Sequence, residues 1–423
     1  MKVFEPKILS TLKNYDGKSA ISDIVSGVIV AIIALPLSLA LAIASGVNPT
    51  QGLYTAIFAG FTIAMFGGSK VNISGPTAAF ATIVATIAAE KGIAALTLAT
   101  VVAGIILMLM GIFRLGTLIK YIPKTITVGF TAGIAITLVV GQLSNFLGVV
   151  IPKTAHNIET IDKVKNIFTY ISTINPSAII IGVSSLAVLI VWGIFIKKIP
   201  ASLVAVIFFS VLVLVFKIPA LTIGEAFEIQ QGFPALTFPE LNLDLFLSIL
   251  PDAFTIALLA GIESLLSCVV SDNMINDTHN PNTELIAQGL GNVCSGIFGG
   301  IPATGAIART AANVKNGGRS PIAGMVHAVV LLLVLLFLVD YAKLIPLSVI
   351  ASILFIVAYN MSEWRSFVKI IKTKKVFDII VLVLTFILTV VKDLVVAIAV
   401  GLVVHYLIVL ITKIIEKKKS KNA

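Results

Sequence analysis

The chain has 423 residues, of which 58% are hydrophobic and only 12% are charged, and its mean hydropathy is +1.08. A soluble domain keeps roughly 25% of its residues charged, so the composition excludes a soluble globular protein and predicts an all-α polytopic membrane protein. The net charge of +10 does not indicate nucleic-acid binding, because the lysines lie in tails and short loops between apolar runs.

Apolar runs of about 20 residues, the length that a transmembrane helix needs, recur from end to end. The sequence predicts fourteen such segments, at 21–45, 50–67, 75–90, 92–113, 124–148, 176–196, 200–216, 245–270, 284–299, 304–315, 321–339, 346–360, 376–391 and 393–415. The third and the tenth are short and rich in small residues. We therefore expect these two to be half-helices that do not span the membrane alone.

Two pairs of similar stretches indicate an internal duplication. "YIPKTITVGF" (121–130) resembles "LIPLSVIASI" (344–353), and "ISGPTAAF" (73–80) aligns with "IPATGAIA" (301–308). The two matches have the same order and nearly the same offset. A unit of seven segments is odd, so its second copy must enter the membrane from the opposite side, which is the inverted repeat of many secondary transporters.

The repeat divides the chain into five parts. We expect a cytoplasmic N-terminal tail, a first seven-segment repeat, an extracytoplasmic loop, a second seven-segment repeat and a cytoplasmic basic tail, at 1–20, 21–216, 217–244, 245–415 and 416–423. Basic residues favour the loops on the side of the N-terminus, as the positive-inside rule requires of cytoplasmic loops. An even number of segments then leaves both termini in the cytoplasm.

Each predicted half-helix follows a Pro and a Gly, in "SGPTAA" (74–79) and "PATGA" (302–306). A helix that begins inside the bilayer exposes backbone N–H groups, and two such ends facing each other near the midplane would suit an anion. Small residues would let a ligand approach the backbone, and Arg309 would add a full positive charge. Alternatively, the breaks are kinks for close helix packing, and Arg309 extends toward the cytoplasm near Lys315.

Glu263 lies near the middle of the segment that opens the second repeat, in "FTIALLAGIESLLSCVV" (254–270). A carboxylate in hydrocarbon costs several kcal/mol if charged, so it is a functional candidate. It could carry a proton, or a cation such as Na⁺ could hold it ionised. Ser267 lies one turn further on the same helix face. The alternative is structural, namely an ion pair between Glu263 and Arg309 or a hydrogen bond to the backbone.

Several stretches together resemble the SulP anion transporters. They are "DIVSGVIVAIIALPLSLALAIASGV" (23–47), "GSKVNISGPTAAF" (68–80), "GIESLLSCVVSDNM" (261–274) and "ELIAQGLGNVCSGIFGGIPATGAIARTAANVKNGGRSPIAG" (284–324). The resemblance implies a seven-plus-seven inverted repeat with a core and a gate domain that move as an elevator. Most members continue into a soluble STAS domain, whereas this sequence ends at "EKKKSKNA", so we expect no STAS domain here.

The resemblance also implies which residues act. It places the anion between the third and tenth half-helices, at Gly75, Pro76, Thr77, Ala78, Ala79, Ala306, Ile307, Ala308 and Arg309. The first segment would contribute near Leu37 and Ser38, although many members have a polar residue where Leu37 stands. Glu263 and Ser267 match the positions that support coupling to H⁺ or Na⁺ in bacterial relatives.

We therefore expect a secondary active transporter of the bacterial cytoplasmic membrane that carries sulfate or bicarbonate by H⁺- or Na⁺-coupled symport. A C4-dicarboxylate or nucleobase symporter of the same fold, and an uncoupled anion exchanger or channel, remain alternatives. No pattern of an enzyme active site is present in the sequence. The expected partners are a small inorganic anion, the lipid bilayer and, as a homodimer, a second copy of the chain. We expect no cofactor besides the coupling ion, and no nucleic acid.

Overall fold

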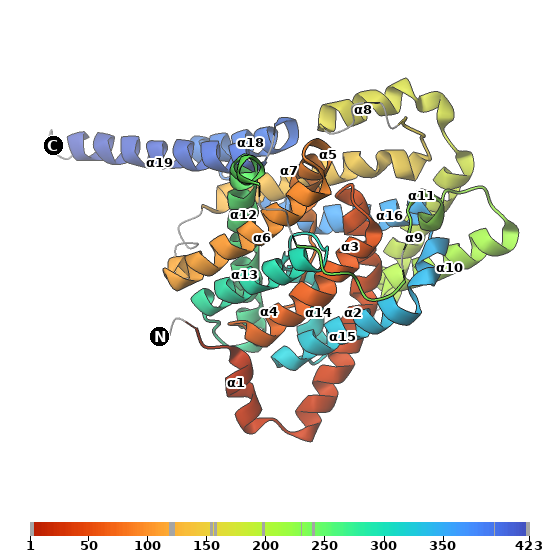
Figure 1. Cartoon of the computed structure of the whole chain (residues 1–423). Coiled ribbons are helices and arrows are strands. Elements are labelled where there is room, and N and C mark those ends of the chain that lie inside the picture. The colour runs from red at the N-terminus through yellow and green to blue at the C-terminus, as the bar shows by residue number, and fades with distance from the viewer. Residues whose placement is uncertain are drawn as a thin grey trace.

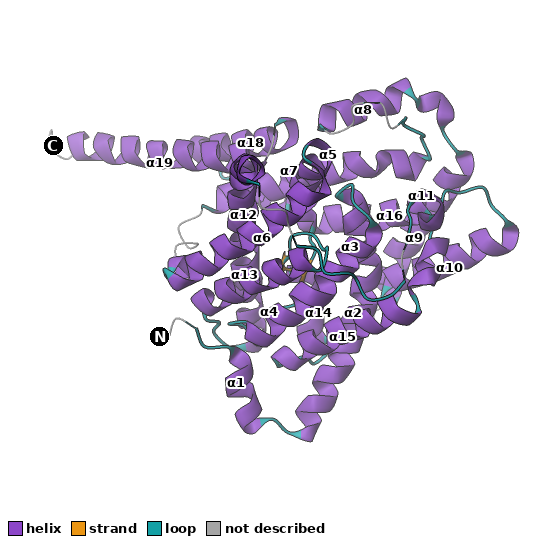
Figure 2. Ribbon diagram, in the orientation of Figure 1, coloured by secondary structure: helices purple, strands orange, loops and turns teal. Residues whose placement is uncertain are grey.

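The computed structural model describes residues 4–117, 123–152, 155, 159–196, 199–229, 231–238, 242–392 and 394–419. Within these residues the chain is almost entirely helical (Figures 1 and 2). The last four residues of the predicted basic tail, 420–423, lie outside this part of the chain, as do 121–122 of the first repeated stretch and 230 and 239–241 of the predicted loop.

The helices follow one another with short connections. Those before residue 217 are α1 (Lys7–Thr11), α2 (Gly17–Ala44), α3 (Pro49–Tyr54), α4 (Gly60–Phe66), α5 (Ala81–Glu90), α6 (Gly92–Ile112), α7 (Lys124–Leu147), α8 (Thr160–Thr169), α9 (Pro176–Phe195) and α10 (Ala201–Phe216). Those after it are α11 (Ile223–Ala226), α12 (Leu243–Ile275), α13 (Pro281–Ile297), α14 (Ile307–Lys315), α15 (Pro321–Phe337), α16 (Leu347–Met361), α17 (Trp364–Lys372), α18 (Val376–Val391) and α19 (Leu394–Lys419).

Several helices begin with the same local chemistry. A side-chain oxygen accepts a hydrogen bond from the first exposed backbone N–H groups, and a proline occupies the first helical position, where its missing N–H has no cost. Helices α3, α9, α13 and α15 start in this way, at Asn48–Pro49, Asn175–Pro176, Asn280–Pro281 and Ser320–Pro321. These dipeptides fix where the helices begin and thereby set the positions of the connections between them.

Two chain breaks cross in the interior. Strand β1 (Ser74–Gly75) pairs antiparallel with strand β2 (Thr304–Gly305), so that Ser74 lies opposite Gly305. A short 3₁₀ turn (Ala78–Phe80) and α5 follow β1, and α14 follows β2. The crossing therefore brings the first turns of the two short helices to the same place.

The helix contacts have the two-fold symmetry that an internal repeat of seven segments requires. If the predicted segments are numbered in order, a contact between two of them has a counterpart between the segments seven positions away. The pair α6–α13 corresponds to α4–α15, α2–α15 to α6–α12, and α7–α18 to α9–α16, and all six pairs are in contact. Helices α4, α6 and α13 lie side by side in Figure 1.

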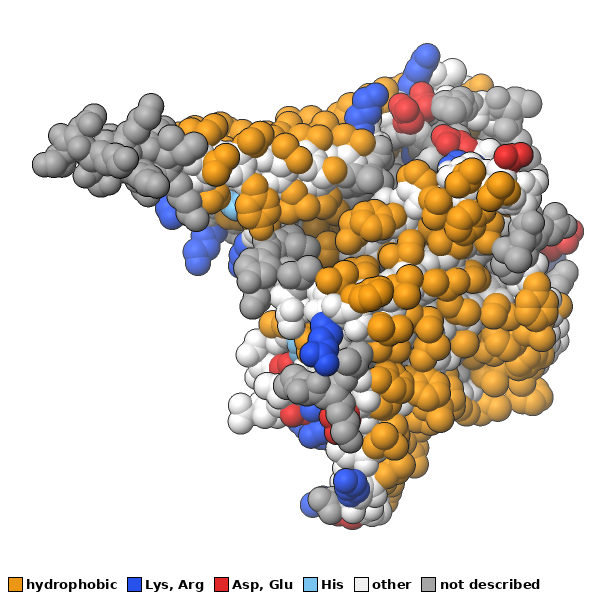
Figure 3. All heavy atoms as spheres, turned by 60° about the vertical axis from the view of Figure 1, so that its left-hand side comes forward, with side chains coloured by type: hydrophobic (Ala, Val, Ile, Leu, Met, Phe, Trp, Pro, Cys, Tyr) orange, Lys and Arg blue, Asp and Glu red, His pale blue; other side chains and the backbone are white. Residues whose placement is uncertain are grey.

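The described residues contain six helices that are long and apolar enough to cross a membrane, α2, α6, α7, α9, α12 and the continuous stretch Leu347–Lys372. Shorter apolar helices of 10–17 residues accompany them, including Ala78–Glu90 and Pro321–Phe337. Exposed hydrophobic side chains cover a broad face of the molecule (Figure 3). Such a face suits the hydrocarbon of a bilayer better than water.

Helices α6 and α13 approach closely because glycines face each other. A Cβ atom added to Gly289 would lie 2.4 Å from the carbonyl oxygen of Gly104 and 2.7 Å from the backbone nitrogen of Met108. Small residues allow this approach inside a membrane. We expect Gly289→Ala to lower the free energy of unfolding by about 1–3 kcal/mol, because the added methyl group overpacks the contact. The midpoint of thermal unfolding of the purified protein measures the change.

The matched control is Gly193→Ala in α9, where the added Cβ would meet no atom within 4 Å. Alanine favours a helix over glycine by up to about 1 kcal/mol, so this control should leave stability unchanged or raise it. An equal effect of both substitutions would contradict the packing described here.

Candidate functional site

Arg309 is buried at the crossing of the two chain breaks. It lies in the first turn of α14 and is only 4% exposed. Its Nη2 atom donates a hydrogen bond to the carbonyl oxygen of Pro76, directly after β1. Its Nη1 atom has no hydrogen-bond partner among the described residues. A buried guanidinium with an unused donor is costly, so this group is available to a ligand.

Gly75 makes room for this guanidinium. A Cβ atom at position 75 would lie 2.6 Å from Nη1 of Arg309 and 3.4 Å from the Cα atom of Ala56. Real Cβ atoms do not approach other heavy atoms so closely. A side chain at position 75 would therefore force the guanidinium of Arg309 to move from the place that it occupies beside the first break.

Arg309 itself belongs to the first turn of α14, and its hydrogen bond to Pro76 brings it to the segment that leads into α5. Ala78 and Ala79 are 4% and 6% exposed, whereas Ile307 at the start of α14 is 39% exposed. The first N–H groups of a helix have no partner within that helix, and they carry the positive end of its dipole. Backbone donors from two helices and one guanidinium donor therefore meet at the crossing.

Glu263 is joined to the same site through Thr77. The hydroxyl of Thr77 donates a hydrogen bond of 2.9 Å to Oε2 of Glu263, while the carbonyl of the neighbouring Pro76 accepts from Arg309. Glu263 is half-buried. No ion pair joins Glu263 to Arg309 within the described residues, so neither side chain is occupied by direct contact with the other.

Ser267 and Ser38 have different surroundings from Glu263. The Ser267 hydroxyl is fully buried and hydrogen-bonds to Oδ1 of Asn72 at 2.8 Å and to Thr310 at 3.2 Å. Ser267 therefore donates its hydrogen to Asn72 and Thr310 and not to Glu263, although the two residues share a helix face. Ser38 is fully buried, and its hydroxyl has no partner within the part of the chain that the structure describes.

The backbone around β2 is supported by side chains of neighbouring helices. Ser264 of α12 accepts a hydrogen bond of 2.9 Å from the N–H of Gly305. The amide of Asn292 in α13 both donates to the carbonyl of Ala303 and accepts from its N–H, each at 2.9 Å. Backbone groups inside a bilayer must find partners within the protein, and these side chains supply them.

A buried carboxylate supports the backbone before β1. Glu284 is fully buried, and its Oε2 atom accepts hydrogen bonds from the N–H groups of Gly68 at 2.9 Å and Ser69 at 3.2 Å. Its Oε1 atom accepts from the side-chain amides of Asn72 at 2.8 Å and Gln288 at 3.0 Å. Sequence reasoning missed this network, although a Glu and two amides in the apolar segment near 284–299 were a visible signal.

The chain is similar in sequence to known membrane proteins over most of its length. The pattern of the sulfate permease family matches residues 21–385. The chain belongs to the sulfate permease family. It is therefore an integral membrane protein and an anion transporter, and it is not an enzyme.

Individual relatives are similar over most of the chain. The putative sulfate transporter YvdB of Bacillus subtilis is 43% identical over 93% of this chain and 74% of its own length. The bicarbonate transporter BicA of Picosynechococcus is 35% identical over 90% of this chain and 69% of its own length. Similarity at this level and coverage supports the same family assignment.

Solved structures agree with the fold. The transmembrane domain of a cyanobacterial bicarbonate transporter BicA is 33% identical, with a TM-score of 0.82, over 90% of this chain and 98% of that chain. Murine Slc26a9, described as an anion transporter in the inward-facing state, has a TM-score of 0.88 over 96% of this chain and 71% of that chain, at 20% identity. The second similarity concerns the fold alone.

Substitution of Gly75 tests the close approach of Arg309. We expect Gly75→Ala to weaken anion binding by the transporter at least tenfold, because the added methyl group displaces the guanidinium and its hydrogen bond to Pro76, each charged hydrogen bond being worth about 1.5–3 kcal/mol. Equilibrium binding of radiolabelled anions to the purified protein measures this effect. Gly17→Ala, where a Cβ meets nothing within 4 Å, is the control and should bind normally. Normal binding by Gly75→Ala would show that Arg309 is not part of the site.

Proposed function

We propose that this chain is a secondary active transporter that carries sulfate or bicarbonate across the membrane together with H⁺ or Na⁺. The observation that carries the proposal is the unpaired Nη1 atom of the buried Arg309, at the meeting point of two helix N-termini. A cation and backbone donors gathered in one buried place suit a small anion. The anion site in this proposal comprises Ser38, whose buried hydroxyl has no partner among the described residues, together with Gly75 to Ala79 and Ala306 to Arg309.

Glu263 is the coupling residue in this proposal. Its hydrogen bond to Thr77 places it beside the anion site but leaves it only half-buried, so an ion can reach it. An ionised carboxylate repels a neighbouring anion, and a proton or Na⁺ on Glu263 removes that repulsion. Binding of the two ions is then mutually favourable, which is the thermodynamic requirement for symport. Ser267 is the second coupling residue in this proposal, because its hydroxyl donates to Asn72 and Thr310 while the lone pairs of its oxygen stay available to Na⁺.

The named relatives support the choice of substrate. One is called a putative sulfate transporter and another a bicarbonate transporter, and this chain is 43% and 35% identical to them. Both substrates are oxyanions with several acceptor atoms, and these match the donors of Arg309 and the helix ends. A nucleobase would need additional polar side chains that read its edge, and the crossing offers chiefly backbone groups and a single guanidinium.

The proposal includes an elevator movement, and the contact symmetry of the two halves supports it. Fourteen segments form two inverted repeats, with both termini in the cytoplasm of a bacterial cell. Helices α2–α6 and α12–α15 form the core that carries the site, while α7–α10 and α16–α19 form the gate. The core slides along the gate as an elevator and exposes the site to each side in turn.

Uptake into proteoliposomes tests the proposal. We expect imposed pH or Na⁺ gradients to drive uptake of radiolabelled sulfate or bicarbonate, and fumarate to be taken up poorly. In Glu263→Gln, uptake should lose its dependence on the gradient, because the glutamine neither binds a proton nor carries a charge. Glu90→Gln, at the exposed end of α5, is the matched control and should behave as wild type.

Other results would point to the alternatives. Uptake that ignores both gradients, with Glu263→Gln equal to wild type, would contradict symport and favour an exchanger or channel. Preferred uptake of fumarate would instead contradict the proposed substrates.

A further inference from the structure

Helix α17 is a short amphipathic helix on the surface. It has nine residues, none of them buried, and connects the long helix α16 to α18. Trp364, Val368 and Ile371 are 45%, 37% and 42% exposed. Their spacing of four and three residues places them on one helix face. The ring of Phe367 packs on Phe386 of α18 with 5.5 Å between the ring centroids, which fixes α17 beside that helix.

The other side of α17 and the turn that follows it are strongly basic. Residues 364–377 contain no Asp or Glu, and their five basic side chains are Arg365, Lys369, Lys372, Lys374 and Lys375. None of the five forms an ion pair with a carboxylate of the described chain. The surface thus combines an exposed tryptophan, an apolar stripe and a net charge of several units, which is typical of a helix that lies at the surface of an anionic membrane.

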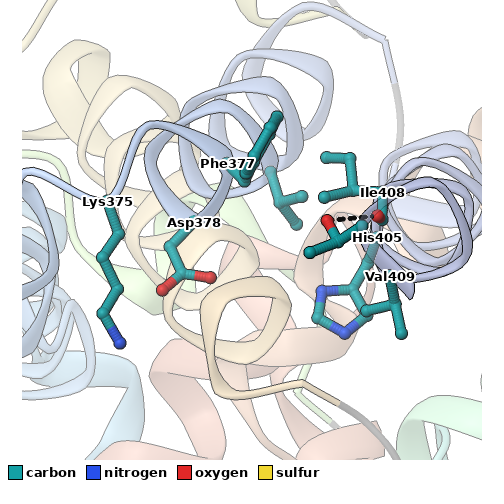
Figure 4. A pocket seen from close by; sticks show the side chains of 8 residues that line it. Lys375, Phe377, Asp378, His405, Ile408 and Val409 are labelled. Carbon is teal, nitrogen blue, oxygen red and sulfur yellow. Dashed lines mark hydrogen bonds between the residues drawn. The ribbon is translucent and has the colours of Figure 1, made fainter. Parts of the chain in front are cut away.

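A groove of about 450 Å³ begins directly beside this basic surface, between α18 and α19. Lys375 and Asp378 lie at one end of it, and His405 of α19 points into it from the opposite wall (Figure 4). Val381, Ile408 and Val409 provide its apolar lining. Figure 3 shows basic side chains gathered next to the apolar surface of α19, which projects from the body. A groove with charged residues at its mouth and an apolar lining fits a molecule that has a charged headgroup and an apolar chain.

We propose that α17 and the groove between α18 and α19 form a binding site for one anionic phospholipid of the surrounding bilayer. The basic side chains of α17 and Lys375 hold the phosphate, and the groove holds part of an acyl chain. Asp378 accepts hydrogen bonds from headgroup hydroxyls, such as those of phosphatidylglycerol. Basic loop residues that only set topology would not need an apolar groove beside them, and a free phosphate ion would leave that groove unused.

The chain contains its own reporter for this site. It has two tryptophans, Trp192 and Trp364, so Trp192→Phe leaves Trp364 as the single fluorophore. The full-length Trp192→Phe protein is reconstituted into bilayers of phosphatidylcholine and phosphatidylglycerol, in which either lipid carries brominated acyl chains at an equal mole fraction. Bromine quenches only nearby tryptophans, so the ratio of the two quenching levels reports which lipid occupies the site.

We expect brominated phosphatidylglycerol to bind beside Trp364 at least fivefold more strongly than brominated phosphatidylcholine, since each basic residue near an anionic surface contributes a factor of about five. The preference should fall to near unity in K369Q/K372Q/K375Q and should decrease at high salt. The control K13Q/K18Q/K315Q removes the same number of exposed charges elsewhere and should keep the preference. Soluble glycerol phosphate should not displace the lipid.

Equal quenching by the two lipids, or an equal loss of preference in the control triple variant, would overturn the proposal. Displacement of the lipid by glycerol phosphate would also overturn it, since the site would then be one for free phosphate. None of these readouts involves transport, so the result is independent of the anion site at Arg309.

Discussion

The structure depends on one constraint, the need to satisfy backbone polar groups where two helices begin inside a membrane. The chain meets this constraint by crossing the two breaks and pairing them as β1 and β2. Polar side chains of α12 and α13 complete the hydrogen bonding, with Ser264 on Gly305 and Asn292 on Ala303. The first turns of α5 and α14 follow directly, and their first N–H groups have no partner within the helix.

The same constraint produces the charge distribution of the site. Arg309 reaches from the second break to the carbonyl of Pro76 in the first break, and Gly75 leaves the space it needs. The guanidinium is buried but keeps an unused donor. Thr77 connects this region to Glu263 through a hydrogen bond. In the function that we propose, the anion and the coupling ion therefore bind at one small crossing rather than in separate pockets.

Much of this arrangement could be predicted from the sequence. Pro, Gly and Arg are rare enough inside apolar segments that 73–80 and 301–309 were recognisable as half-helix starts. Glu263 was recognisable because a carboxylate is energetically costly in hydrocarbon and is therefore rare there unless it has a function.

The partners of the polar side chains could not be predicted in the same way. Helical periodicity placed Ser267 on the face of Glu263, but it gave no information about Asn72, which comes from a distant segment and takes the Ser267 hydroxyl. Three of the four hydrogen bonds to Glu284 likewise join segments more than two hundred residues apart. The fourth comes from Gln288 within α13. The amphipathic α17 was interpreted only as a basic loop, because its role depends on the groove beside it.

The most direct test of the account is the shift that anions cause in the midpoint of thermal unfolding of the purified protein, compared between wild type, Arg309→Gln and Arg319→Gln. A ligand that binds only the folded state stabilises it by RT ln(1 + [L]/Kd), so the midpoint rises with the ligand concentration relative to Kd. Arg319 donates to the carbonyls of Val314 and Gly318 and lies outside the crossing, so it is a matched control. The account predicts stabilisation by sulfate or bicarbonate in wild type and Arg319→Gln, and little or none in Arg309→Gln. An equal shift in all three proteins would show that the anion binds somewhere else.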